Sequence, residues 1–211
     1  MQISLNKRNF IKSAYSLSEP QELKFQNLID ELKIWNLHTN LVGRSTLISP
    51  WNSHILDSIQ ISNLIKNKNS SILDMGTGAG LPGLVLAIMD YKKVNLIDSN
   101  GKKIRFIKHV CSKYKIKANI FLGRIEKMKK NKYDFLISRA LAKLNQLFVY
   151  SQNFINNDSV LIFLKGKNIN SEIIEAKKQW SFKFKLIKSK SDDRGRVLLV
   201  ENLSFKKWQK L

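Results

Sequence analysis

The sequence predicts an α/β fold: a mostly parallel, seven-stranded sheet that ends in an antiparallel hairpin and follows an N-terminal helical extension. From residue 70 onward, short runs rich in β-branched and aromatic residues alternate with amphipathic stretches, the pattern of a parallel sheet with helices on both faces. The last two runs are joined by a short polar turn, so they should pair antiparallel. Residues 1–65 show only helical spacing. We therefore expect residues 1–65 to pack as an extension on a core of residues 66–211, in one structural domain.

Two helices are expected in the extension. The first begins near Ser18, whose hydroxyl can cap it, with Pro20 in the first turn. Its apolar residues recur at helical spacing: Phe25, Leu28, Ile29, Leu32 and Trp35. The second helix is expected over residues 50–65, with one apolar face formed by Trp51, Ile55, Leu56 and Ile59.

Seven strands are expected in the core. They cover residues 71–75, 94–97, 119–122, 133–138, 160–164, 182–187 and 197–203. Helical patterns lie between the first five strands. The turn between the last two strands falls at residues 191–195, which read Ser-Asp-Asp-Arg-Gly.

The charge is large and unevenly placed. Lys and Arg number 37 against 16 Asp and Glu, a net charge of +21. Residues 1–65 carry six bases and five acids, so residues 66–211 carry the other 31 and 11, a net charge of +20. The segment Lys102–Lys132 contains twelve bases and one acid, Glu126. Such a field suits a polyanion, usually nucleic acid, although a lysine- and asparagine-rich composition can also come from an AT-rich genome.

Composition excludes several classes of protein. A single cysteine, Cys111, allows neither an internal disulfide nor a thiolate zinc site, and we expect no metal. The longest apolar run, residues 81–89, is about half the length of a membrane span. With no signal-peptide pattern at the N-terminus, we expect a soluble, cytoplasmic protein without membrane contact.

The sharpest motif follows the first expected strand, where Asp74 to Gly83 read Asp-Met-Gly-Thr-Gly-Ala-Gly-Leu-Pro-Gly. A dinucleotide fingerprint requires G-x-G-x-x-G, and Leu81 breaks it. An acid followed by G-x-G-x-G is similar to the loop that binds S-adenosylmethionine. That ligand carries an ammonium and a sulfonium group, so an acid beside the loop has electrostatic sense. The three glycines, of which Gly76 and Gly78 come first, are a weak signal alone.

Two further elements strengthen the interpretation. Asp98 ends the second expected strand, twenty residues after Gly78, where a carboxylate can accept both hydroxyls of a ribose; the alternative is a solvent-facing acid. Ile125 and Glu126 follow the third strand, in a loop that borders the adenine in such folds. There Ile125 can pack on the ring and Glu126 can accept from the exocyclic amine; the alternative is a turn with a salt bridge.

The end of the fourth strand constrains the methyl acceptor. Residues 137–141 read Ile-Ser-Arg-Ala-Leu, not the Asp/Asn-Pro-Pro-aromatic quartet of enzymes that methylate exocyclic amines. Carbon-5 methylation needs a cysteine nucleophile, and Cys111 is interpreted as a core residue. Guanine N7 has a free lone pair and needs only positioning. Arg139 cannot remove a proton, so we expect it to organise the pocket, and we expect no general base.

The chain resembles the ribosomal RNA small subunit methyltransferase G family over roughly residues 23–203. The resemblance rests on Trp35-Asn36, Asn40-Leu41, His54-Ile55-Leu56-Asp57-Ser58, the loop Asp74 to Gly83, Leu96-Ile97-Asp98-Ser99, Arg124-Ile125-Glu126, Ile137-Ser138-Arg139-Ala140 and Leu164-Lys165-Gly166. It implies methyl transfer from S-adenosylmethionine to N7 of one guanine in 16S rRNA. By matching position, it implies cofactor contacts at Gly76, Leu81, Ile125, Glu126 and Arg139.

The expected partner is 16S rRNA or the small ribosomal subunit, bound by a monomer. The resemblance implies that Arg44 and Lys165 contact RNA, and the basic segment adds Lys102 and Lys103 as candidates. Residues 191–196 follow the family pattern only loosely, and residues 205–211 form an unmatched basic tail. Two alternatives stay open: a methyltransferase of another RNA or of a small molecule, and a non-catalytic RNA-binding module.

Overall fold

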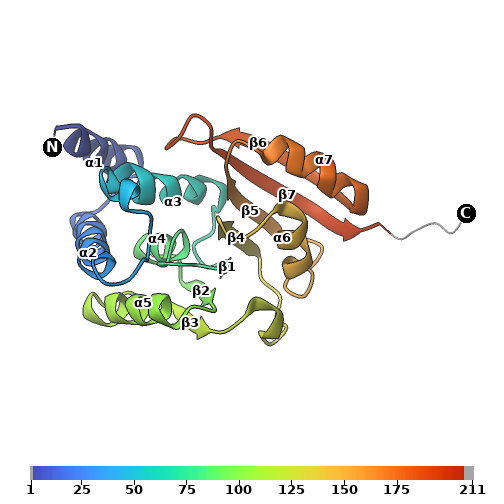
Figure 1. Ribbon diagram of the computed structural model, residues 1–211, viewed down its shortest axis with the longest axis horizontal. Coiled ribbons are helices and arrows are strands. Elements are labelled where there is room, and N and C mark those ends of the chain that lie inside the picture. Colours follow the sequence, from blue (N-terminus) through green and yellow to red (C-terminus); the bar gives the residue numbers. More distant parts are fainter. Residues whose placement is uncertain (1, 207–211) are drawn as a thin grey trace, which may run out of the picture.

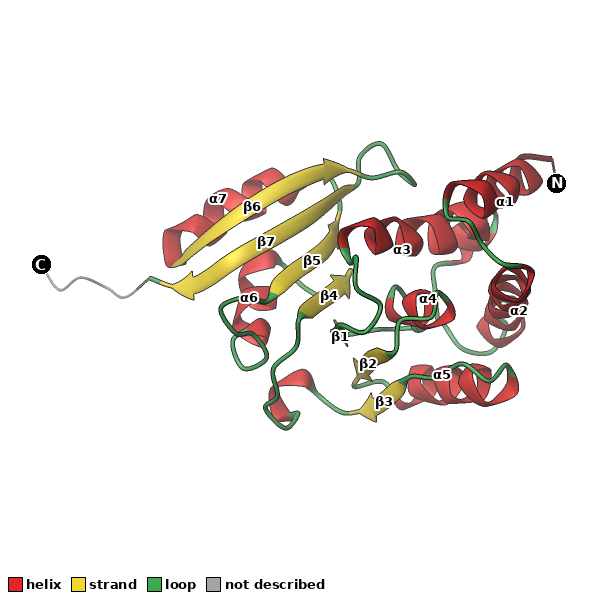
Figure 2. Cartoon of the chain, turned by 180° about the vertical axis from the view of Figure 1, so that it is seen from behind, coloured by secondary structure: helices red, strands yellow, loops and turns green. Residues whose placement is uncertain are grey.

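The computed structural model describes residues 2–206, so most of the basic tail, residues 207–211, lies outside the described residues. Its centre is a seven-stranded sheet of order β3-β2-β1-β4-β5-β7-β6 (Figures 1 and 2). The strands are β1 (Ser71–Met75), β2 (Lys93–Asp98), β3 (Asn119–Leu122), β4 (Phe135–Arg139), β5 (Val160–Lys165), β6 (Trp180–Lys188) and β7 (Arg196–Phe205). The first five run parallel, and β7 pairs antiparallel with both β5 and β6. The predicted fold class and hairpin are confirmed.

Helices cover both faces of this sheet (Figure 1). The extension contains α1 (Gln2–Ala14), α2 (Glu19–Asn36), η1 (Arg44–Leu47), η2 (Trp51–Leu56), α3 (Asp57–Ile59) and η3 (Gln60–Leu64). The core adds α4 (Gly83–Ile88), α5 (Gly101–Lys113), η4 (Ile125–Lys127), α6 (Leu144–Ser151) and α7 (Ile169–Gln179). One apolar cluster joins the extension, α4 and α5 to one sheet face, and a second joins α6 and α7 to the other.

The first predicted helix is α2, and it begins directly after Ser18, as predicted. The Ser18 hydroxyl accepts from the backbone N–H of Gln21, and the Gln21 side chain accepts from the backbone N–H of Ser18, a reciprocal capping box. The expected helix over residues 50–65 is instead three successive segments, η2, α3 and η3. Its first segment is π-helical, a local departure that apolar periodicity does not reveal and that is frequent at functional sites.

The extension is fastened to the core through α2 and α5. Glu31 is 4% exposed and accepts from Lys113 Nζ at 2.7 Å and from the Tyr114 hydroxyl at 2.9 Å. A buried carboxylate needs such compensation to remain charged. The pKa of Glu31 is lowered: its hydrogen bonds to Lys113 and Tyr114 and the nearby His109 outweigh burial, which acts in the opposite direction.

The carboxyl ends of β1, β2 and β4 meet at one edge of the sheet, where ligands of open α/β sheets bind. Within residues 2–206, no helix is long and apolar enough to cross a membrane. The same part of the chain holds no cluster of His, Cys, Asp or Glu side chains suited to a metal ion.

Candidate functional site: a cavity at the carboxyl edge of the sheet

Two adjoining hollows lie at this edge. The larger has a volume of about 720 Å³ and is bordered by the extension, the glycine loop and Arg139. The smaller, of about 80 Å³, is bordered by the loop after β3. Gly76, Asp98, Ser99 and Leu141 line both hollows. All seven residues predicted to bind the cofactor, Gly76, Gly78, Leu81, Asp98, Ile125, Glu126 and Arg139, line one hollow or both.

The glycine loop lies over the end of β2 with its backbone in the left-handed region. Gly76 has a φ of +64° and Gly78 a φ of +59°, a conformation that other residues adopt at a cost. A Cβ on Gly76 would also collide with the Leu141 side chain. Geometry therefore requires glycine at position 76 and favours it at position 78.

Asp98 links the loop to the next strand. Its Oδ2 accepts from the backbone N–H of Gly78 at 2.8 Å, and its Oδ1 accepts from that of Asn100 at 2.8 Å. Asn100 in turn caps α5, because its Oδ1 accepts from the N–H of Lys102 at 2.9 Å. Each carboxylate oxygen has a further lone pair, so Asp98 can accept from a ribose while it holds the loop.

The smaller hollow has an apolar wall and an acidic rim. Ile125 is 7% exposed and packs in the same cluster as Ile97. Glu126 is exposed, and within residues 2–206 it forms no ion pair. The salt-bridged turn that was the alternative for this loop is therefore absent from the described residues. Tyr150 of α6 adds an aromatic ring that sequence reasoning did not identify.

Asp74, the acid that precedes the glycine loop, does not line the cavity. It is fully buried, and its Oδ2 accepts from the Thr77 hydroxyl at 2.6 Å and from the Gly83 N–H at 2.8 Å. Burial raises the pKa of Asp74 to about 6, against these two hydrogen bonds. The carboxylate therefore closes the loop from beneath: it lies beside the loop, as expected, but it does not line the cavity.

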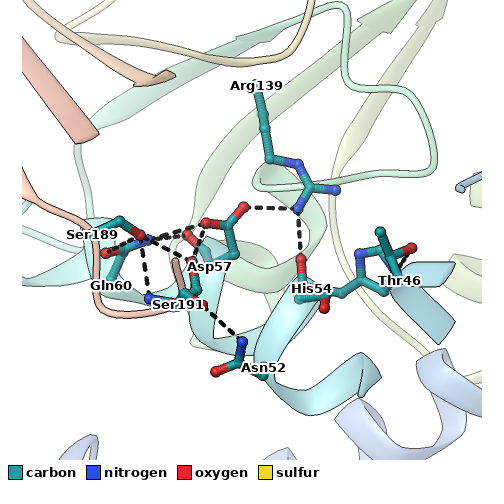
Figure 3. Close-up of polar contacts among 9 residues, drawn as sticks. Thr46, Asn52, His54, Asp57, Gln60, Arg139, Ser189 and Ser191 are labelled. Carbon is teal, nitrogen blue, oxygen red and sulfur yellow. Dashed lines mark hydrogen bonds and ion pairs between the residues drawn. The ribbon is translucent and has the colours of Figure 1, made fainter. Parts of the chain in front are cut away.

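Arg139, at the end of β4, is held by the extension. Its Nη1 donates to Asp57 Oδ2 at 3.0 Å and to the backbone oxygen of Ser53 at 3.2 Å (Figure 3). Both partners line the larger hollow with Arg139. Asp57 belongs to the block His54-Ile55-Leu56-Asp57-Ser58 of the family resemblance, which was the only signal for it in the sequence.

His54, another residue that was not predicted, is 2% exposed. Its Nε2 lies 3.0 Å from the Thr46 hydroxyl oxygen, and that hydroxyl donates to the Gly43 carbonyl at 2.6 Å. Because the hydroxyl proton is already used, His54 Nε2 must donate and Nδ1 carries the lone pair. Burial and the charge of Arg139 lower the pKa of His54 to about 4, so the ring stays neutral at physiological pH.

The single cysteine of the chain is not placed to act as a nucleophile. Cys111 is buried in α5, and burial raises its pKa to about 11. It lines neither hollow of the cavity. Its interpretation as a core residue is confirmed.

The four basic residues predicted to contact RNA are not all at the cavity. Lys103 lines the larger hollow, Lys102 is exposed in the first turn of α5, and Arg44 is exposed in η1 beside Gly43 of the rim. Lys165 is different: its side chain is 10% exposed and its Nζ lies 2.7 Å from Glu172 Oε2.

The seven-stranded sheet with its antiparallel hairpin is the fold of solved S-adenosylmethionine-dependent methyltransferases. A TehB-like SAM-dependent methyltransferase from Corynebacterium glutamicum has a similar fold, with a TM-score of 0.58 at 14% identity over 75% of this chain and 94% of that chain. A mutant of MtNAS in complex with S-adenosylmethionine gives a TM-score of 0.52 at 15% identity over 87% of this chain and 72% of that chain. At these identities the likeness shows the fold alone.

The chain belongs to the rRNA small subunit methyltransferase G (GidB) family, whose model matches residues 21–196. The ribosomal RNA small subunit methyltransferase G of Rickettsia prowazekii (strain Madrid E) is 38% identical over 180 residues, covering 85% of this chain and 92% of that protein. The protein of the same name from Orientia tsutsugamushi (strain Ikeda) is 38% identical over 193 residues, covering 92% and 96%. The predicted family, enzyme class and cofactor are confirmed.

Proposed function

We propose that this protein transfers a methyl group from S-adenosylmethionine to N7 of one guanine in 16S rRNA. The observation that carries the proposal is a cofactor cradle with no free general base beside Arg139. Asp57 is ion-paired with Arg139, and the lone pair of His54 lies on Nδ1, a fully buried atom of a ring whose pKa is about 4. Guanine N7 offers an unprotonated lone pair, so the chain's residues need only orient the base and exclude water.

The cavity fits the cofactor chemically. When bound, S-adenosylmethionine supplies an electrophilic methyl group on a sulfonium. We assign the ribose hydroxyls to Asp98, the adenine to Ile125 and Glu126, and the amino-acid end to the backbone around Gly76, Gly78 and Leu81. Arg139 organises the pocket beside that end. The positive φ of Gly76 and Gly78, and the hydrogen bond from the Gly78 N–H to Asp98, support this assignment.

RNA docking is assigned to the basic rim formed by Arg44, Lys102 and Lys103. We assign Lys165 a structural role instead. Its Nζ also donates to the Ala142 carbonyl at 2.9 Å, so it fixes the loop after Arg139 and does not contact RNA. The extension and the core share one apolar cluster, and we propose that residues 1–65 and 66–211 work as one domain in a cytoplasmic monomer. The partner is free 16S rRNA or the small ribosomal subunit.

The test is methylation of rRNA from cells that lack this gene. Purified protein and radiolabelled S-adenosylmethionine are incubated with naked 16S rRNA and, separately, with small subunits, and the labelled nucleoside is identified. We expect one N7-methylguanine in 16S rRNA. Label at another atom or in another RNA would overturn the proposal. Failure of the folded protein to bind S-adenosylmethionine would favour a non-catalytic RNA-binding module.

A further inference from the structure

The charge of the larger hollow differs from that of the chain. The chain as a whole carries +21. The hollow is lined by two carboxylates, Asp57 and Asp98, and by two cationic groups, Lys103 and Arg139, so its formal charges cancel. This neutrality depends on Asp57, because without it the lining would carry one net positive charge.

Asp57 is directed at Arg139 and is itself held from two sides. Its Oδ2 lies 3.0 Å from Arg139 Nη1, and the two side chains are 22% and 19% exposed. Its Oδ1 accepts from the Ser191 hydroxyl at 2.6 Å and from Gln60 Nε2 at 3.3 Å. Figure 3 shows the carboxylate between the guanidinium and these partners. The pair is therefore built into the fold and is not a mobile surface contact.

One partner of Asp57, Ser191, comes from a distant part of the chain. Ser191 follows β6, and its hydroxyl also lies 2.9 Å from that of Ser189. Gln60 accepts from the N–H of Lys190 at 2.9 Å, and Asn52 Nδ2 donates to the Ser191 carbonyl at 2.8 Å. The extension, the end of β4 and the loop after β6 thus meet at one carboxylate.

The ion pair of Asp57 and Arg139 affects how the larger hollow binds a cationic ligand. The sulfonium of S-adenosylmethionine is positive, and in a partly buried site a neighbouring guanidinium repels it with an energy set by distance and local dielectric. We propose that Asp57 is the counter-ion and positioning residue of Arg139, which keeps the cavity neutral and allows it to hold the sulfonium. The inference rests on the proposed assignment of this cavity to the cofactor.

The test compares two ligands that differ in this charge. S-adenosylhomocysteine has a neutral thioether where S-adenosylmethionine has a sulfonium, so the ratio of their dissociation constants isolates the charge effect from general damage to the site. Calorimetry would measure both ligands with the wild type and with Asp57→Asn, Arg139→Gln and the double variant. Asp193→Asn is the matched control, because its carboxylate is 92% exposed and pairs with Lys188 outside the cavity.

In Asp57→Asn we expect the affinity for S-adenosylmethionine to fall about tenfold relative to that for S-adenosylhomocysteine. In Arg139→Gln the ratio should move the opposite way, because Asp57 is then uncompensated. The double variant should return close to the wild-type ratio, and Asp193→Asn should not move it.

Ratios within twofold of the wild type in Asp57→Asn and Arg139→Gln, or an equal shift in Asp193→Asn, would overturn the inference. If Asp57→Asn does not fold, Arg139→Gln still decides through the sign of its shift. A wild type that binds neither ligand would instead overturn the cofactor assignment under the proposed function.

Discussion

Asp98 Oδ2 accepts a hydrogen bond of 2.8 Å from the backbone N–H of Gly78, which joins the end of β2 to the glycine loop that follows β1. The two residues are twenty positions apart, and the parallel register that places Met75 beside Ile97 brings them together. One carboxylate therefore shapes the loop and also faces the cavity. Under the proposed function, the structural role and the ligand-binding role therefore fall on the same side chain.

Replacement of Asp98 by alanine should weaken binding of S-adenosylmethionine at least about tenfold, because hydrogen bonds to a charged acceptor contribute about 1.5–3 kcal/mol each. Asp98→Asn, which keeps one acceptor oxygen for the Gly78 N–H, should lose less. Calorimetry on both variants, with circular dichroism to verify folding, measures the effect. A folded Asp98→Ala protein with wild-type affinity would remove Asp98 from the cofactor site.

A methyl group at Gly76 should also damage the site. Gly76→Ala places a Cβ at a positive φ and against the Leu141 side chain, so we expect lower stability and a cofactor affinity reduced by about tenfold or more. Gly166→Ala is the control, because a Cβ there meets nothing within 4 Å. Thermal unfolding and ligand titration would be measured on both. Equal affinity in the two variants would contradict the cradle role of Gly76.

Much of the fold follows from local sequence. Strands at residues 71–75 and 119–122 were predicted with the bounds that β1 and β3 have. β1 is a buried, mostly apolar run between turn residues, whereas β3 is a largely exposed edge strand. The hairpin was predictable from the short turn before Arg196. The bounds of β4 were less so: Tyr133 was predicted to begin this strand, but its N–H donates to the Phe154 carbonyl, and β4 begins at Phe135.

The candidate site was predictable only where a motif is local. The glycine loop and Asp98 carry their chemistry in their spacing, whereas Asp57 and Ser191 are 134 residues apart and no periodicity connects them. The same limit explains Lys165, a basic residue whose partner Glu172 becomes visible only when β5 and α7 are placed in space. Contacts between different elements of the fold depend on tertiary structure, which a single sequence does not display.

The exposed basic face of α5 should contribute to RNA binding through charge. Lys102, Arg105 and Lys108 are exposed on this helix, and their replacement by glutamine should reduce the slope of log K against log salt concentration by about 0.7–0.9 per lost phosphate contact. The control set is Lys66, Lys68 and Lys93. These lysines are exposed near the N-terminal ends of β1 and β2, away from the cavity. Filter binding of 16S rRNA across a salt series would measure both sets. If the two variants had equal slopes, the basic charge of α5 would be a feature of composition and not of RNA binding.

His54 should make stability depend on pH. The pKa of His54 in the folded chain is about 4, below the ordinary value of 6.5, so the unfolded chain takes up a proton in this range before the folded chain does. The contribution of neutral His54 to the free energy of unfolding is therefore complete above pH 6.5. It is lost as the pH falls toward 4, by about 3 kcal/mol in all.

His54→Gln should thus be less stable than the wild type at pH 7.5. The difference between their free energies of unfolding should be smaller by about 2–3 kcal/mol at pH 4.5. Urea unfolding at both pH values measures it. His38→Gln, at an exposed histidine, is the control. A gap in His54→Gln that stays constant with pH would contradict a neutral, buried His54.

Arg139 should act through the shape of its guanidinium. Arg139→Lys keeps the charge but loses the rigid, planar guanidinium that places Nη1 against both Asp57 and the Ser53 carbonyl, so most of the activity should disappear while the protein remains folded. If chemistry limits turnover, kcat of the wild type should be nearly flat between about pH 7 and 9, because no general base titrates there. Single-turnover kinetics on small-subunit RNA would test both expectations. A pKa near 7.5 in the rate profile would place a base in the mechanism, and a fully active Arg139→Lys protein would remove the guanidinium from it.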